Sequence, residues 1–578
     1  MTEAFLVFAL AVGLGWPLGH YLATVMRGEP MRGDRLFGVL ERPIYRLLGT
    51  NPRQGMTWRG YAWAFIASNL VLGALVWLLF MAQGWLPLNP DGIPGMRWDT
   101  ALHTMVSFLT NTNQQHYSGQ AQLSYLSQMV GIVGLQVATP MMGLAVLAAT
   151  LRALMGGRQA IRSGADPAAT AGSEPDVGNY WADLVRPTLR LLLPLCLLWS
   201  VLLVSQGVPA TLEAGPTVRP LDASAGMAAQ KIPLGPVAPM VAIKQLGTNG
   251  GGWYGPNSAM PLENPTPFSN LLETLAIVLL PVAVAFMVGP FTGRRKFTAL
   301  VVASMLLLSV LSAGAGMLAE GSGATGTATG TAVMEGKEVR FGIEPSALWA
   351  SLTTQTSNGS VDAMHDSLAP LTGLVALGNM LVNAIWGGIG CGVQQFLVYL
   401  LLAVFLAGLM TGRTPELFGR KIEAREVRLL SLLVLLQPLA VLGFTAITLA
   451  IPAITGNSNP GFHGVTQVFY EYTSAFANNG SGFAGLGTAT YWWNLSCTVV
   501  LALGRYPGLL VPLAVAAGMA RKRHAPAGPG SLDTETPTFA LTTIAVIVIL
   551  TLLQFMPVLV LGPVAEHLSL AAHGGPIA

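Results

Sequence analysis

The chain has 578 residues, of which 52% are hydrophobic and only 10% are charged, with a formal net charge of +3. Soluble proteins carry about 25% charged residues, so this chain could not cover its surface in water, and a soluble enzyme is excluded. Disorder is excluded too, because it requires low hydrophobicity and high net charge. The small net charge does not indicate a nucleic-acid binder. The composition therefore predicts a polytopic membrane protein.

Ten apolar stretches are long enough to cross a bilayer, which takes about 20 mostly apolar residues. In chain order they are 4–26, 60–82, 125–151, 188–206, 270–292, 298–319, 370–410, 428–451, 493–520 and 538–561. The stretch 370–410 is too long for one straight span and contains GGIGCG from Gly387 to Gly392, which predicts a broken helix. The first stretch lacks a basic start and a small-residue cleavage site, so we expect a span there rather than a signal peptide.

Lys and Arg gather in every second connection between these stretches. The basic connections are 27–59, 152–190, 294–296, 413–428 and 521–523, whereas 452–490 contains neither residue. Basic residues mark the cytoplasmic side of membrane proteins. We therefore predict ten spans with both termini outside.

Each of the four long outward connections contains a polar segment that directly follows an apolar one. The segments are TNTNQQHYSG at 110–119, GTNGGGWYG at 247–255, TTQTSNGSV at 353–361 and SAFANNGSGFAGL at 474–486. We align Gln115, Gly250, Gly359 and Gly480 at one equivalent position, each preceded by Gln or Asn. One such segment would usually be a surface turn. Four at the same place predict a repeat of span, short pore helix, polar loop and span, with the first and last stretches as accessories.

A pore explains non-helical segments inside membrane-spanning units. Such backbone survives at membrane depth only where protein buries it or where it lines a wet cavity. Four loops around a pseudo-fourfold axis could present rings of carbonyl oxygens that replace the water around a cation. None of the aligned segments contains a carboxylate, so we expect neutral dipoles that favour weakly hydrated K⁺.

At these loops and elsewhere, the sequence resembles the potassium-binding A subunit of the Kdp-type potassium-transporting ATPase. The resemblance covers essentially the whole chain and includes RPIYRLLG at 42–49, LPLNP at 86–90, MEGKEVRFG at 334–342, AMHDS at 363–367, LAGLMTGRTPELFGRKI at 406–422 and LGPVAE at 561–566. It implies the channel-like, ion-selective subunit of an ATP-driven, high-affinity potassium uptake complex in the bacterial inner membrane.

The expected fold class is an all-α polytopic membrane protein with about ten transmembrane helices. Four fused span–pore-loop–span units would surround a pseudo-fourfold pore, with two accessory spans. The expected boundaries are an N-terminal span and cytoplasmic loop at 1–59, pore units at 60–155, 184–292, 297–411 and 428–521, and a C-terminal span at 537–578.

The resemblance also implies site residues and partners. Selectivity-filter residues carry over to Asn113, Gln115, Thr248, Asn249, Gly250, Ser357, Asn358, Gly359, Asn478, Asn479 and Gly480. The partners would be a P-type ATPase B subunit that splits ATP, a C subunit, a small F subunit and membrane lipids, with potassium as the transported ion. Three positions depart from the family pattern: Gln114 replaces a frequent Trp, Asn383 replaces a frequent Glu, and GRRKF at 293–297 lacks an acid.

Pore or gate residues are expected at Gly387, Gly388 and Gly390, inside the overlong stretch, and at Arg505, a charge within an apolar span. The alternatives are close helix packing for the glycines and, for Arg505, snorkelling from a helix end.

An ATP site is not expected in this chain. The segment Gly330–Lys337 has the wrong spacing for a phosphate-binding loop, and no DKTG phosphorylation sequence is present. A non-hydrolysing pump subunit is therefore the leading functional hypothesis. The alternative is a stand-alone potassium channel or symporter of the Trk, Ktr or HKT type, which shares the four-unit pore.

Overall fold

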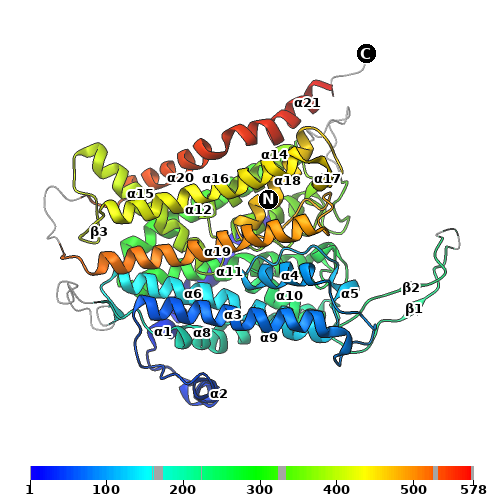
Figure 1. Ribbon diagram of the computed structural model, residues 1–578, viewed down its shortest axis with the longest axis horizontal. Coiled ribbons are helices and arrows are strands. Elements are labelled where there is room, and N and C mark those ends of the chain that lie inside the picture. The colour runs from blue at the N-terminus through cyan, green and yellow to red at the C-terminus, as the bar shows by residue number, and fades with distance from the viewer. Residues whose placement is uncertain are drawn as a thin grey trace.

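The computed structural model describes residues 2–158, 161, 174–222, 224, 226–322, 334–524 and 532–573. Ten helical segments in these ranges are long and apolar enough to cross a membrane, and they run side by side (Figure 1). They are Thr2–Arg27, Trp58–Trp85, Ser127–Leu154, Tyr180–Ser205, Pro267–Thr292, Arg295–Gly321, Cys391–Thr411, Ala424–Ala450, Tyr491–Ala520 and Pro537–Leu570. The predicted ten spans and the all-α polytopic fold are confirmed.

Four units of the same design follow one another along the chain. Unit 1 contains α3 (Trp58–Ala82), the short helix α4 (Trp98–Leu109), and η2 (Ser127–Ile132) continuing into α6 (Val133–Leu154). Unit 2 contains α8 (Tyr180–Pro187), η4 (Thr188–Leu192), α9 (Leu193–Ser205), the short helix α10 (Val237–Leu246) and α11 (Pro267–Thr292). Unit 3 contains α12 (Arg295–Gly321), the short helix α13 (Ile343–Gln355), α14 (Pro370–Val382) and α15 (Cys391–Thr411). Unit 4 contains α16 (Ala424–Ala450), the short helix α18 (Phe462–Phe476) and α19 (Tyr491–Ala520).

The remaining elements flank these units. The outer helices are α1 (Thr2–Arg27), α2 (Asp34–Leu47), α20 (Pro537–Leu559), η8 (Val560–Val564) and α21 (Ala565–His573). Short helical turns are η1 (Gln83–Trp85), α5 (Gly119–Gln122), η6 (Asn257–Ala259), η7 (His365–Ser367) and α17 (Pro452–Thr455). Two antiparallel strand pairs complete the described part, β1 (Thr217–Val218) with β2 (Gln230–Lys231) and β3 (Glu416–Leu417) with β4 (Arg420–Lys421). The first pair projects away from the helices (Figure 1).

Helix α11 is the most deeply buried span, with 89% of its apolar window inside the molecule. Its start is fixed by Thr266, whose side chain accepts a hydrogen bond from the backbone N–H of Ser269 at 3.0 Å, a capping contact that satisfies an otherwise unpaired donor. The accessory helix α1 packs on α11 at Gly15 and Gly19. A Cβ on Gly19 would lie 2.6 Å from the carbonyl oxygen of Ala283, so these small residues permit the close approach.

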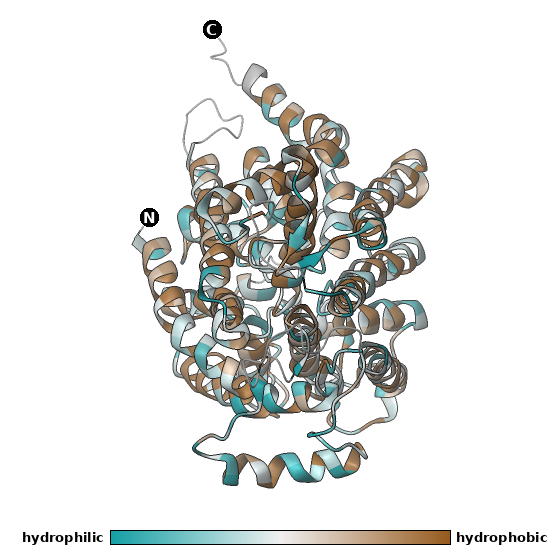
Figure 2. Ribbon diagram, turned by 90° about the vertical axis from the view of Figure 1, so that its left-hand side faces the viewer, coloured by the Kyte–Doolittle hydropathy of each residue, from teal (hydrophilic) through white to brown (hydrophobic). Residues whose placement is uncertain are grey.

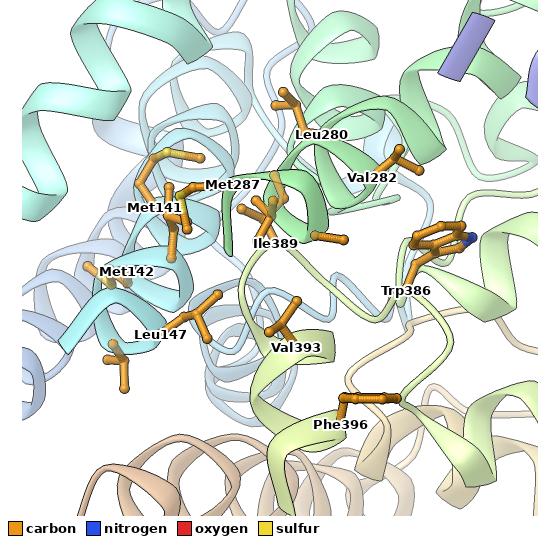
Figure 3. Packing of buried hydrophobic residues seen from close by; sticks show 14 of the residues in the cluster. Met141, Met142, Leu147, Leu280, Val282, Met287, Trp386, Ile389, Val393 and Phe396 are labelled. Carbon is orange, nitrogen blue, oxygen red and sulfur yellow. The ribbon is translucent and has the colours of Figure 1, made fainter. Parts of the chain in front are cut away.

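The third unit has the predicted broken helix. Helix α14 ends at Val382, and the next residue, Asn383, has a left-handed backbone with φ of 47°; α15 begins after Gly390, which has φ of 83°. The intervening loop is buried, and Figure 3 shows its Ile389 beside Met287 of α11, near Met141 of α6. Helix packing alone therefore does not explain the glycine run, because the chain leaves the helix there.

The C-terminal helix is attached to unit 4 by an ionic cluster. Nδ1 of His463 lies 2.7 Å from Oε1 of Glu566, and its Nε2 lies 2.8 Å from Oδ1 of Asp366. Burial opposes the charged form, but hydrogen bonds to both carboxylates raise the pKa of His463 to about 9. The imidazolium therefore links three segments of the chain at neutral pH.

Candidate functional site

Each of the four short helices ends four residues before a residue with a left-handed backbone. The helices end at Leu109, Leu246, Gln355 and Phe476. The left-handed residues are Asn113 (φ 59°), Gly250 (80°), Gly359 (86°) and Gly480 (99°). We call these four the ring positions.

The two residues before each ring position also repeat. The first has positive φ in every loop: Asn111 (62°), Thr248 (51°), Ser357 (52°) and Asn478 (53°). The second donates its backbone N–H to the carbonyl five residues earlier, at 2.9 to 3.1 Å, and these second residues are Thr112, Asn249, Asn358 and Asn479. The same backbone is thus built four times, and its left-handed residues turn the carbonyls between them in a direction that a strand or helix would not allow.

This geometry corrects the alignment of the first loop. Asn113, and not Gln115, matches Gly250 in backbone conformation and in distance from its helix. Gln115 lies two residues further along, level with Gly252. Its Nε2 donates to the Gly252 carbonyl at 3.0 Å, and its Oε1 accepts from the Gly252 N–H at 2.9 Å. Gln115 therefore clamps loop 1 to loop 2 beyond the ring.

The four loops contact one another in chain order and close a ring. A Cβ placed on Gly250 would overlap the carbonyl oxygen of Asn358 in the next loop. In the same way, a Cβ on Gly359 would overlap the carbonyl of Asn479, and one on Gly480 that of Thr112. The circuit closes between loops 1 and 2, where Nδ2 of Asn111 donates to the Thr248 carbonyl at 2.9 Å.

Asparagine side chains connect loops 3 and 4 to the backbone of the preceding unit. Nδ2 of Asn358 donates to the carbonyl of Lys244 in unit 2 at 3.0 Å. Nδ2 of Asn479 donates to the carbonyl of Thr353 in unit 3 at 2.8 Å. These amides therefore act as struts between units, and they do not use the carbonyls of the residues just before the ring positions.

Four of those carbonyls form the chemical centre of the site. They belong to Thr112, Asn249, Asn358 and Asn479, each of which is completely buried. Within the described part of the chain, none of these carbonyl oxygens accepts a hydrogen bond. Buried carbonyls are almost always paired in native proteins. A ring of four unpaired oxygens offers the kind of neutral donors that a cation without its water requires.

Charged groups lie behind the loops and are paired there. Lys244 of α10 is fully buried and forms an ion pair with Glu263. It also donates to Oδ1 of Asn257 at 2.7 Å, while Nδ2 of Asn257 donates to the Gly250 carbonyl at 2.6 Å. The pair thus fixes loop 2 without facing the ring.

A second polar network joins loop 1 to unit 4. Nε2 of Gln114 donates to Oε1 of Glu471 at 2.5 Å, and the same oxygen lies 3.2 Å from Nε2 of His116. In the described residues, His116, Glu471 and Cys497 have ligand atoms within 4.8 Å of one another. Since His116 also contacts Asn494 at 2.8 Å, its two ring nitrogens are already engaged in this network.

A cavity of about 40 Å³ lies on the side of the loops where the broken helix passes. Its lining residues are Asn111, Ser357, Asn383, Gly388, Cys391, Gln395, Ala477, Asn478, Gly504, Arg505, Gly508 and Leu509. The structure thus brings Arg505 and the glycine loop to one place beneath the ring, although they are more than 100 residues apart in the sequence.

Arg505 is only 4% exposed, so its side chain does not snorkel to the surface. Its Nη1 lies 2.8 Å from Sγ of Cys391, and its Nη2 donates to the carbonyl of Thr139 at 3.1 Å. The glycine loop is held from above, because the N–H of Gly387 donates to the carbonyl of Gln355 at 2.8 Å. A fixed positive charge therefore borders the cavity.

Asn383 connects two of the loops from below. Its Oδ1 accepts from the Ser357 hydroxyl at 2.9 Å, and its Nδ2 donates to the carbonyl of Ala477 at 3.3 Å. The neutral amide at this position thus participates in the architecture of the site.

A family profile described as "Potassium-transporting ATPase A subunit" matches residues 5–568. The chain belongs to this family. It is 47% identical over 563 residues to the potassium-transporting ATPase potassium-binding subunit of Gloeobacter violaceus, covering 95% of each chain. It is 45% identical over 572 residues to the subunit of the same name from Pseudomonas putida, covering 98% of each.

A solved structure has the same overall fold. The potassium transporter TrkH from Vibrio parahaemolyticus superposes with a TM-score of 0.50 and 14% sequence identity, covering 87% of this chain and 96% of that one. At this identity the likeness concerns the fold alone.

Sequence reasoning missed two residues of this candidate site, Asn111 and Thr112. The interval from the end of the short helix is the same in all four loops, but the ends of these helices come from the structure. Aligning instead on Gly and on a preceding amide placed Gln114 and Gln115 where Thr112 and Asn113 belong.

Proposed function

We propose that the chain binds K⁺ in the ring of loop carbonyls and passes it from the outside toward the cavity beneath, as the ion-selective subunit of an ATP-driven, high-affinity potassium uptake complex. The observation that carries this proposal is the ring of four buried, unpaired carbonyl oxygens of Thr112, Asn249, Asn358 and Asn479. The names of the relatives, potassium-binding subunit, supply the ion.

The filter consists of the residues around this ring. They include the sequence-derived set Asn113, Thr248, Asn249, Gly250, Ser357, Asn358, Gly359, Asn478, Asn479 and Gly480, with Asn111 and Thr112 added and Gln115 placed at the outer edge. Neutral oxygens favour K⁺ over Na⁺, because a flexible carbonyl ring does not repay the greater dehydration cost of the smaller ion. The nearby carboxylates do not disturb this balance, since Glu263 and Glu471 are engaged behind the loops.

The glycines Gly387, Gly388 and Gly390 act as a gate in the proposed path, and Arg505 sets its electrostatics. A guanidinium that lines a cavity of about 40 Å³ repels a cation that has left the ring. Potassium therefore does not run freely through the chain, which suits a pump subunit better than an open channel.

ATP hydrolysis is assigned to partners: a P-type ATPase B subunit, with a C subunit and a small F subunit. In support, the relatives are named as subunits of an ATPase, and the sequence contains no DKTG. The segment Gly330–Lys337 lies partly outside the described residues. The proposed location is the inner membrane with both termini in the periplasm, following the basic connections.

Ion-stimulated ATPase activity of the co-purified complex tests this function. We expect K⁺ and Rb⁺ to stimulate hydrolysis at far lower concentrations than Na⁺, and the chain purified alone to hydrolyse nothing. Equal stimulation by Na⁺ would refute the neutral filter. If the chain alone catalysed K⁺ flux in liposomes as fast as the complex, the Trk-type alternative would be correct.

A further inference from the structure

Helix α2 presents an apolar stripe to the outside of the molecule. The stripe consists of Leu36, Val39, Leu40, Pro43 and Leu47, all exposed, at the spacing of one helix face. Leu36 and Val39 are each 69% exposed, and Leu47 is 88% exposed. An apolar stripe of this kind on a charged helix is typical of helices that lie in the membrane interface.

The position of α2 agrees with a helix that lies in the membrane interface. The helix lies beside the bundle, and its axis runs across the direction of the spanning helices (Figures 1 and 2). Glu41 and Tyr45, on the opposite side of α2 from the stripe, are buried against the protein. Arg35, Arg42 and Arg46 are exposed along one flank of the stripe. The stripe therefore faces away from the protein, with basic residues at its border.

A polar cavity of about 500 Å³ separates α2 from the spanning helices. Its lining residues are Gly28, Glu29, Pro30, Asp34, Glu41, Arg53, Arg158, Arg186 and Arg190. This volume is more than ten times that of the cavity beneath the ring.

The three acids of this cavity are already engaged. Arg190 pairs with Asp34 at 2.7 Å and with Glu41 at 2.6 Å. Glu29 pairs at 2.9 Å with Arg27, just outside the lining set. By contrast, the guanidinium groups of Arg53 and Arg186 have no ion-pair partner within the described ranges. The cavity therefore has positive charge to offer to an anion.

We propose that α2 lies among the headgroups of the leaflet on the arginine-rich side, and that this cavity binds the phosphate of an anionic phospholipid through Arg53 and Arg186. The apolar stripe favours a lipid over an acidic protein segment, because a helix whose leucines face the membrane puts the neighbouring cavity in the same leaflet as the lipid headgroups. Basic pockets and juxtamembrane arginines are the usual recognition elements for such headgroups. The proposal is independent of the ion chemistry of the filter.

Lipid binding to the intact purified complex tests the cavity. Native mass spectrometry with phosphatidylglycerol and phosphatidylcholine as probes would compare the wild type with Arg53→Gln/Arg186→Gln. Two lost arginines should weaken phosphatidylglycerol binding about 20- to 30-fold and leave phosphatidylcholine unchanged. Arg295→Gln is the matched control, since Arg295 is exposed at the start of α12, away from the cavity. Equal weakening in the control, or none in the double variant, would overturn the site.

A second measurement keeps every lining residue intact. A fluorophore on Leu47→Cys reports the surroundings of the stripe, because the native cysteines Cys196, Cys391 and Cys497 are buried or half-buried. Brominated phosphatidylglycerol should quench it more strongly than brominated phosphatidylcholine. Equal quenching by both lipids would mean a membrane surface without anionic selectivity. No quenching by either would mean that a partner protein covers α2, and both results would overturn the proposal.

Discussion

The first of the four polar loops and the other three have the same backbone conformation but different residues. Loops 2, 3 and 4 place Gly at the ring position and Asn before it, whereas loop 1 has Asn113 and Thr112. Asn is among the few residues with a side chain that tolerate a left-handed backbone. The conformation is thus conserved around the ring although the residue is not.

The difference follows from what each ring position touches. In loops 2 to 4, a Cβ would overlap a carbonyl of the next loop, so only Gly fits. Asn113 faces loop 2 instead, where Gly251 makes room: a Cβ on Gly251 would lie 2.8 Å from the Cβ of Asn113. Nε2 of Gln136 then donates to Oδ1 of Asn113 at 3.1 Å. At the junction of loops 1 and 2, loop 1 therefore carries the side chain at its ring position, and loop 2 carries the glycine that makes room for it. We call this arrangement the exchange between loops 1 and 2.

The largest effect is expected from Gly359→Ala. The new methyl would overlap the Asn479 carbonyl at a φ of 86°, where L-residues are strained. Displacing one ring carbonyl should raise the K⁺ concentration for half-maximal ATPase stimulation about a hundredfold or more. Gly314→Ala, in α12 with no atom within 4 Å of its Cβ, is the control and should behave as wild type. A normal K⁺ requirement in Gly359→Ala would remove this loop from the ion site.

The second prediction uses Gln115, which clamps loop 1 to Gly252 outside the ring. Gln115→Arg would place a cation near the ion. At about 8 Å and an effective dielectric of about 20, the repulsion is about 2 kcal/mol, or about 30-fold in K⁺ affinity. Gln115→Glu disturbs the same clamp without adding a cation, so K⁺-stimulated ATPase assays of both variants separate charge from structure. Similar losses in the two variants would show that the clamp alone matters.

Gln115 also shows which part of the site could not be predicted from the sequence. The spans and the broken helix were predictable because bilayer thickness imposes their length and glycines mark the break. The existence of four loops followed from repetition. The register of loop 1 was not predictable from residue type, since its ring position is the only one without Gly. The struts depend on remote backbone groups such as the Lys244 carbonyl, which no local pattern indicates.

The third prediction tests the exchange between loops 1 and 2. Gly251→Ala would bring a methyl to 2.7 Å from Phe108 and 2.8 Å from Asn113, and we expect about tenfold weaker K⁺ stimulation from the overpacking. Adding Asn113→Gly removes one of the two clashes and should restore part of the affinity. A double-mutant cycle on half-saturation measures this coupling. Strict additivity of the two changes would contradict the exchange.

The smallest effect is expected from Thr112→Asn, which gives loop 1 the residue that the other loops have before the ring position. The ring receives a backbone carbonyl from this position, not a side chain, so K⁺ half-saturation should change by less than about threefold, within the range of one ordinary hydrogen bond. The Thr112 hydroxyl still has a structural part, because it accepts from Nδ2 of Asn478 at 3.0 Å and contacts the Thr110 hydroxyl at 2.8 Å. Thr112→Val keeps the shape and removes that acceptor, so it should weaken K⁺ stimulation more than Thr112→Asn, whose amide oxygen can replace it. The reverse order in the ATPase assay would mean that the shape of this side chain, and not the hydrogen bond to Asn478, matters here, and a loss well beyond threefold in Thr112→Asn would contradict a contribution from the backbone carbonyl alone.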